Sequence, residues 1–159
     1  MEFNLEPSEK LLLLRTAREA IAAALEGRRP SFAEPTPALK RRCGAFVTLN
    51  KNGRLRGCIG FITAAKPLIE TVQEAAVAAA REDPRFEPVK PGELPAVHIE
   101  ISVLSPLRPV ASSDEIEVGR HGILLRRGGR SGLLLPQVAT EYGWDRETFL
   151  SHTCAKAGL

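Results

Sequence analysis

Two glycine-containing turns, each flanked by apolar segments, restrict the fold of this chain more than any other feature. The turns are Asn52-Gly53, between residues 44–49 and 54–60, and Gly128-Gly129, between residues 122–127 and 131–135. Asn-Gly and Gly-Gly readily adopt the positive φ values of a tight β-hairpin. Each turn therefore predicts a pair of antiparallel strands, and the two hairpins together predict a mainly antiparallel sheet.

Residues 97–104 alternate apolar and polar side chains and give the clearest single strand in the sequence. In a strand this alternation places His98, Glu100 and Ser102 on one face, and the apolar residues between them on the other. A further short strand is predicted around Ile116 and Val118, just before Gly119.

Helices are predicted at three main places. Residues 9–26 have apolar side chains at helical spacing, with Ser8 as the N-cap, and residues 68–81 follow Pro67 and are rich in alanine. The last helix follows Asp145, and Pro136 begins a turn or short helix before it. The expected inner faces are Leu11, Leu14, Ala17, Ile21 and Leu25 in the first helix, and Leu68, Val72, Ala75, Ala76 and Ala79 in the second.

The order of these elements is helix, hairpin, helix, strand, hairpin and helix. It predicts an α+β fold in which about three helices pack on a mainly antiparallel sheet. With 159 residues, the chain has the length of one domain, and we expect residues 1–159 to form it without a second independent domain.

The charge and the N-terminal sequence bear on partners and location. The net charge of +3 is too small to identify a nucleic-acid-binding protein. The basic clusters Lys40-Arg41-Arg42 and Arg126-Arg127/Arg130 are interpreted mainly as solvated loop and hairpin faces, with a phosphate- or RNA-contacting edge as the alternative. Residues 1–7 are acidic, unlike a secretory leader, and the four leucines at 11–14 are too few to span a membrane. We therefore expect a cytoplasmic protein.

The motif content favours neither a cofactor nor a metal. There is no phosphate-binding loop, no dinucleotide fingerprint and no HExxH motif. The three cysteines, Cys43, Cys58 and Cys154, are odd in number and widely spaced, which argues against a disulfide framework and against a structural zinc site. We expect no cofactor and no metal, although Cys58, His98, Glu100 and His121 include enough ligand types for a weaker metal-site hypothesis.

Cys58 is the strongest candidate for chemistry. It lies in the segment Arg56-Gly57-Cys58-Ile59-Gly60, where glycines leave the backbone uncovered and the sulfur approachable. Arg56 is two residues earlier on the same predicted strand, so both side chains are expected on one face, where a guanidinium favours the nucleophilic thiolate. The alternative is that Cys58 is a small buried hydrophobic residue, as most free cysteines are.

His121 is the second candidate. It lies between Gly119 and Gly122, just before a predicted strand, so it could be exposed and act as acid, base or ligand. The alternative is a turn histidine that bonds to the backbone. Asp83, Arg85 and Glu87 surround Phe86 and are interpreted as anchors of the loop after the second helix.

Several of these segments resemble the AMMECR domain family, in the family's order and over nearly the whole chain. They are Leu55-Arg56-Gly57-Cys58-Ile59-Gly60, Asp83-Pro84-Arg85-Phe86, Ile99–Ser105, Gly119-Arg120-His121-Gly122-Ile123, Leu135-Pro136-Gln137-Val138, Gly143-Trp144-Asp145 and Phe149–Leu159. The resemblance implies that prokaryotic relatives continue past Gly158-Leu159 with a proline and a further strand.

The resemblance implies an α+β fold of a larger and a smaller lobe with a groove between them. Prokaryotic members similar to this chain are called protein A of the AmmeMemoRadiSam system, whose partners are a Memo-like protein, related to extradiol dioxygenases, and a radical SAM enzyme. The resemblance implies matched residues at Arg56, Gly57, Cys58, Gly60 and His121. It also matches Phe86, Glu100, Gln137 and Trp144, for which a structural role is expected.

Two hypotheses follow. In the first, the chain is an enzyme or enzyme component in which Cys58 is the nucleophile, Arg56 stabilises it or an anionic substrate, and His121 moves protons, while Gly57, Gly60 and Glu100 contribute to binding. In the second, the chain is a non-catalytic binding or scaffold module for a protein partner, a nucleotide or RNA. The sequence decides neither between them nor the oligomeric state.

Overall fold

The computed structural model describes residues 4–159 and divides the chain into two compact units. The first unit extends to Leu107 and the second comprises Arg108–Leu159. Helices and antiparallel sheets occur in both units, which confirms the predicted α+β class. Each unit is described below by itself.

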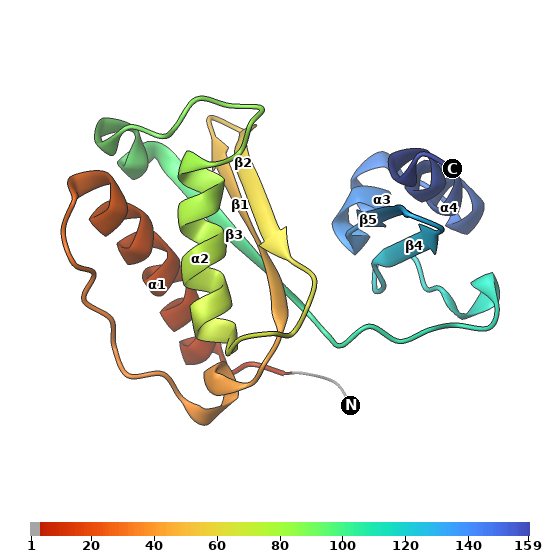
Figure 1. Ribbon diagram of the computed structural model, residues 1–159, viewed down its shortest axis with the longest axis horizontal. Helices are drawn as coiled ribbons and strands as arrows, with labels where there is room; N and C mark the ends of the chain where they lie inside the picture. The colour runs from red at the N-terminus through yellow and green to blue at the C-terminus, as the bar shows by residue number, and fades with distance from the viewer. Residues whose placement is uncertain (1–3) are drawn as a thin grey trace. The chain divides into compact units, whose positions relative to one another are not determined.

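The first unit is a three-stranded antiparallel sheet with two helices on one face (Figure 1). Its strand order is β2-β1-β3. Helices α1 and α2 pack against each other, and α2 covers β1 and β2. The elements in chain order are α1 (Pro7–Glu26), β1 (Gly44–Lys51), β2 (Arg54–Phe61), α2 (Leu68–Arg81) and β3 (Val97–Leu104), with 3₁₀ turns at Pro37–Lys40 and Pro91–Ala96.

The core of this unit lies between the helices and the alternate strand residues that face them. Ala45, Val47 and Leu49 of β1 are fully buried against α2. The predicted inner face of α2 is buried as expected, and its alanines bring the helix backbone close to the sheet. The opposite face of the sheet carries Thr48, Cys58, Glu100 and their neighbours, because residues two apart on a strand share a face.

The beginning and the inner face of α1 differ from the prediction. The helix starts at Pro7, and its N-cap is Glu6, whose backbone N–H donates to the Glu9 carboxylate at 3.0 Å; Ser8 lies inside the first turn. Leu13 is buried, whereas Leu11 and Leu14 are exposed. The expected placement of Leu11 and Leu14 in the core was therefore wrong, and that of Ala17 and Ile21 is confirmed.

The second unit is a hairpin packed against a helix. Strands β4 (Ile123–Arg127) and β5 (Arg130–Leu134) form the hairpin, followed by α3 (Pro136–Tyr142) and α4 (Arg146–Ala157), and α4 packs on both strands (Figure 1). The core residues are Ile116, Ile123, Ala139 and Phe149. Residues 116–118 form no strand and follow a 3₁₀ turn at Ser113–Glu115, so the short strand predicted there was wrong.

Candidate functional site

Cys58 lies on the sheet face that the helices leave uncovered. On β1 its partner is Thr48, which is paired with Glu100 of β3 on its other side, so the three residues form a row across the sheet. The Cys58 thiol is half-buried, and its Sγ lies 3.3 Å from the Thr48 hydroxyl oxygen. Sγ is therefore held in a polar contact.

The glycines beside Cys58 are required by packing. A Cβ at Gly57 would lie 2.2 Å from the carbonyl oxygen of Ala79 in α2, and a Cβ at Gly60 would lie 2.3 Å from the Phe46 ring. The prediction that these glycines mark a bulge or a close approach is confirmed. The neighbour that approaches Gly57 is the protein's own helix. A binding role for Gly57 and Gly60 stays a prediction.

Arg56 lies on the other face of the sheet from Cys58, so the expected shared face was wrong. Leu49 pairs with Gly57 but Asn50 pairs with Leu55, which leaves Arg56 as the extra residue of a β-bulge. A bulge places its two residues on the same side, so Arg56 follows Gly57 toward the helices. The shared face was inferred from the alternation of side chains along a regular strand, and the one extra residue of the bulge interrupts that alternation.

The Arg56 guanidinium forms hydrogen bonds with the connection between α2 and β3. Its Nε and Nη2 each donate to the Glu93 carboxylate at 3.2 Å, and Nη1 donates to the Glu87 carbonyl at 2.7 Å. Only 16% of the Arg56 side chain is exposed. Arg56 therefore links the α2–β3 connection to the bulge, and these contacts direct its guanidinium away from the Cys58 thiol.

Arg85, which the sequence assigned only to the loop, is linked to Cys58 through Asp83. Arg85 forms a two-pronged ion pair with Asp83, at 3.0 Å from Nε and 2.8 Å from Nη2. Asp83 also accepts the backbone N–H of Cys58 at 3.0 Å. The hydrogen bonds that Arg85 donates to the Asp83 carboxylate chiefly raise the pKa of Arg85, and electrostatic attraction to Cys58 makes a smaller contribution.

Asp83 is almost fully buried, and it completes the hydrogen bonding of an edge strand. Strand β2 is at the edge of the sheet, and the N–H of Cys58 points away from β1 to the Asp83 carboxylate. The hydrogen bonds from Arg85 hold the pKa of Asp83 well below its usual range, with a further contribution from the Cys58 N–H. The only sequence signal for this role is a short acidic and basic pair directly after a helix.

Arg56 and Glu93 give a first testable prediction. The hydrogen bonds from Arg56 chiefly lower the pKa of Glu93 to about 2 from its ordinary value of 4.5. A depressed carboxyl pKa stabilises the fold above the unfolded value, and this stability is lost as the pH falls from about 4.5 toward 2. Urea unfolding should therefore show a smaller loss of stability over this range for Glu93→Gln than for the unchanged chain.

The matched control for this prediction is Glu100→Gln, an exposed carboxylate in the same unit. It should follow the unchanged chain over the whole pH range. Arg56→Lys should resemble Glu93→Gln, because an ammonium cannot reproduce the fork of a guanidinium. Equal acid sensitivity in all four proteins would contradict the assignment.

His121 belongs to the second unit, where it bonds within its own turn. Its Nδ1 accepts the backbone N–H of Glu117 at 3.0 Å, and its backbone N–H donates to the Glu117 carbonyl at 3.0 Å. The alternative of a turn histidine bonded to backbone is thus what the structure contains. Since Nδ1 is an acceptor, the neutral imidazole carries its proton on Nε2, which has no partner in these contacts. A proton-transfer role stays a prediction.

Glu100 and His98 are exposed on β3, on the predicted shared face. In neither unit, among residues 4–159, do three histidine, cysteine, aspartate or glutamate side chains gather closely enough to hold a metal ion. Within the same residues, no helix combines the length and the apolar character that crossing a membrane requires.

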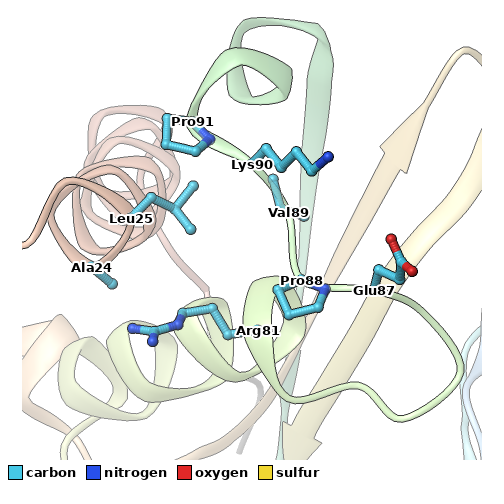
Figure 2. A pocket seen from close by; sticks show the side chains of 8 residues that line it. All are labelled: Ala24, Leu25, Arg81, Glu87, Pro88, Val89, Lys90 and Pro91. Carbon is cyan, nitrogen blue, oxygen red and sulfur yellow. The ribbon is translucent and has the colours of Figure 1, made fainter.

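Two surface pockets lie on the helix side of the first unit, away from Cys58. The first has a volume of about 480 Å³ between the ends of α1 and α2 and residues 87–91 (Figure 2). Arg56 binds the carbonyl oxygens of Glu87 and Pro88, so it anchors one wall of this pocket. The second pocket, of about 520 Å³, lies between α1 and α2 and includes Phe32 and Phe61. Neither pocket is lined by Cys58 or Arg56.

The fold places this chain in a class of small α+β proteins. Its sheet is covered by helices on one face and has a cysteine flanked by glycines on the other. A family model described as AMMECR1 matches residues 14–159. The chain therefore belongs to the AMMECR1 family, as the sequence resemblance predicted.

Relatives and a solved structure agree with this membership. Protein MK0488 of Methanopyrus kandleri is 49% identical over 168 aligned residues, which cover 99% of this chain and 80% of that protein. Protein PH0010 of Pyrococcus horikoshii is 43% identical and is covered to 83% of its length. A crystal structure of PH0010, described there as an uncharacterized protein, matches with a TM-score of 0.90 at 42% identity, covering 98% of this chain and 82% of that one.

Proposed function

We propose that this chain is a cytoplasmic, thiol-dependent component of a modification system that also contains a Memo-like protein and a radical SAM enzyme. The partners come from the family resemblance. The observation that carries the thiol part is the position of Cys58, half-buried on the uncovered sheet face and joined to Arg85 through the Asp83 carboxylate. In this proposal the two units work as one domain of 159 residues.

The roles differ from those expected from sequence in one respect. Cys58 would serve as the nucleophilic thiol, and Arg85, in place of Arg56, would stabilise the negative charge on sulfur. Thr48 orients the sulfur through the 3.3 Å contact with its hydroxyl. Glu100, on the same sheet face, would contribute to substrate binding, and His121 would act as an acid or base within the second unit, through Nε2. Arg56 is assigned to positioning, through its contacts with Glu93.

Two features of Arg85 limit its expected effect on the reactivity of the Cys58 thiol. Arg85 is paired with Asp83, so part of its positive charge is neutralised before it reaches the thiol. Its side chain is also 55% exposed, so water screens the interaction. We therefore expect Arg85 to accelerate thiol chemistry by a few-fold, on the order of 3- to 10-fold, corresponding to about 1 kcal/mol.

Alkylation provides the test of the thiol site. Cys58 and Cys154 are both half-buried, so Cys154 is an internal reference within the same chain. With iodoacetamide at neutral pH, followed by mass spectrometry of the peptides, Cys58 should react faster than Cys154. Arg85→Gln should slow the reaction of Cys58 by the factor above and leave Cys154 unchanged. Arg81→Gln, at an exposed arginine of α2, is the matched control.

The opposite outcome favours the second hypothesis. If Cys58 reacts no faster than Cys154, and Arg85→Gln changes neither rate, the thiol assignment is wrong and the chain is better described as a docking module. The partner assignment has a separate test. The chain should co-purify with a Memo-like protein and a radical SAM enzyme encoded beside it when the three are co-expressed, and absence of such a complex would contradict that part alone.

A further inference from the structure

We propose that the second unit binds single-stranded nucleic acid along α4 and the turn between β4 and β5. In this site, bases stack on the exposed faces of an aromatic stack, and phosphates contact arginine and lysine side chains beside it. The proposal is independent of the Cys58 chemistry, because every residue that carries it lies between positions 126 and 158.

Three aromatic rings of this unit are nearly parallel. The Trp144 ring lies 3.9 Å from the His152 ring at an interplanar angle of 2°, and 5.0 Å from the Tyr142 ring at 15°. The Trp144 ring also lies 6.5 Å from the buried Phe149 ring, at an interplanar angle of 38°. Tyr142 is 69% exposed, and His152 is also exposed. A prearranged stack with accessible outer rings is the platform on which single-stranded bases bind.

Positive charge continues from the rings toward the end of α4. Lys156 is exposed and follows His152 by four residues, so it lies on the same helix face about 6 Å further along the axis. Arg130 donates to the carbonyl oxygen of Gly158 at 2.6 Å, which fixes its guanidinium at the helix end. His152 and Lys156 therefore follow one another along α4, and Arg130 of β5 lies at its C-terminal end.

The turn between β4 and β5 adds a feature that the fold itself does not explain. Arg127 and Arg130 are directly opposite each other across the hairpin, and like charges in that position are destabilising. Among residues 4–159, no carboxylate forms an ion pair with Arg126 or Arg127. An anionic partner would offset this repulsion, and phosphates spaced along a strand provide such charge.

The two features together favour single-stranded nucleic acid over an acidic protein segment. Charge alone would suit either partner, but stacked rings with exposed faces match the flat faces of unpaired bases. Paired bases in a duplex are stacked on each other and do not offer those faces. The arginines of the hairpin turn are expected to contact phosphates and not the edges of bases. Binding should therefore show little sequence preference.

The experiment uses the full chain with fluorescein-labelled oligouridylate and oligothymidylate at about 50 mM salt, followed by anisotropy. The chain has one tryptophan, so quenching of Trp144 fluorescence reports binding at the stack itself. Tyr142→Ala should weaken binding about tenfold, whereas Tyr142→Phe, which keeps the ring, should not. Arg127→Ala should reduce the slope of log affinity against log salt by about 0.7. RNA and DNA arms show whether the 2′-hydroxyl matters.

Matched controls come from the first unit. Phe32→Ala removes a ring of 37% exposure, and Arg54→Ala removes an exposed arginine beside a hairpin turn; both should leave affinity and salt slope unchanged. No binding at low salt overturns the proposal. The proposal is also overturned if Tyr142→Ala leaves the affinity unchanged. It is likewise overturned if duplex RNA or polyglutamate binds with the same affinity without quenching Trp144, because such binding would reflect charge alone.

Discussion

Replacing Gly57 by alanine should destabilise the first unit by about 2–4 kcal/mol, more than any other single methyl addition discussed here. The added Cβ would lie 2.2 Å from the carbonyl oxygen of Ala79. That oxygen belongs to the backbone of α2 and cannot rotate away, so the helix has to move from the sheet. The buried contacts of Leu49 and Val72 would loosen with it.

Gly92→Ala is the matched control for this prediction. Gly92 is also in the first unit, its φ is not in the left-handed region, and a Cβ there would meet nothing within 4 Å. It should change the free energy of unfolding by no more than about 0.5 kcal/mol. Urea unfolding followed by far-UV circular dichroism measures both variants. Equal stability of the two would mean that α2 and β2 are not as close as described.

The elements that the sequence predicted correctly are those whose signals are local. Helix α2 and strand β3 have the predicted bounds, 68–81 and 97–104. The apolar residues of both elements recur with an unambiguous period. Pro67 directly precedes α2, and Pro106 follows the end of β3. Both hairpins are also as predicted, and Asn52, Gly53 and Gly128 adopt positive φ angles within the turns.

The inner face of α1 illustrates where local signals are insufficient. Residues 11–14 are four consecutive leucines, so more than one helical stripe is apolar and the sequence period does not select among them. Packing against α2 selects Leu13 and leaves Leu11 and Leu14 exposed. A similar limit applies to residues 116–118, whose apolar side chains enter the core of the second unit without strand pairing.

The candidate site was predicted in its centre but not in its surroundings. The segment around Cys58 is recognisable because two glycines, Gly57 and Gly60, within one strand are unusual. The error at Arg56 arises from one bulged residue, which the sequence pattern does not show. Arg85 was missed as a neighbour because 27 positions separate it from Cys58, and only the fold brings them together. The sequence was therefore wrong about the face on which Arg56 lies, while the role of Cys58 stays a prediction.

Removal of the Asp83 carboxylate is the second change expected to have a large effect. Asp83→Ala should destabilise the chain by about 2–4 kcal/mol, because it leaves the Cys58 N–H without an acceptor and Arg85 without its partner. Asp83→Asn keeps the shape and one acceptor oxygen, so it should cost roughly half as much. Unfolding by urea at neutral pH measures both.

The pH dependence separates the charge of Asp83 from its shape. The pKa of Asp83 is lower in the folded chain than its ordinary value of 3.8, chiefly because of Arg85. The ionised form therefore stabilises the fold above about pH 3.8, and this contribution decreases as the pH falls below that value. The difference in stability between the unchanged chain and Asp83→Asn should accordingly narrow between pH 5 and pH 2. A difference that is constant over this range would mean that the carboxylate acts through its shape alone.

The Asp83→Asn variant also links stability to chemistry. Because this change leaves the charge of Arg85 unneutralised, it should speed alkylation of Cys58 in the folded protein.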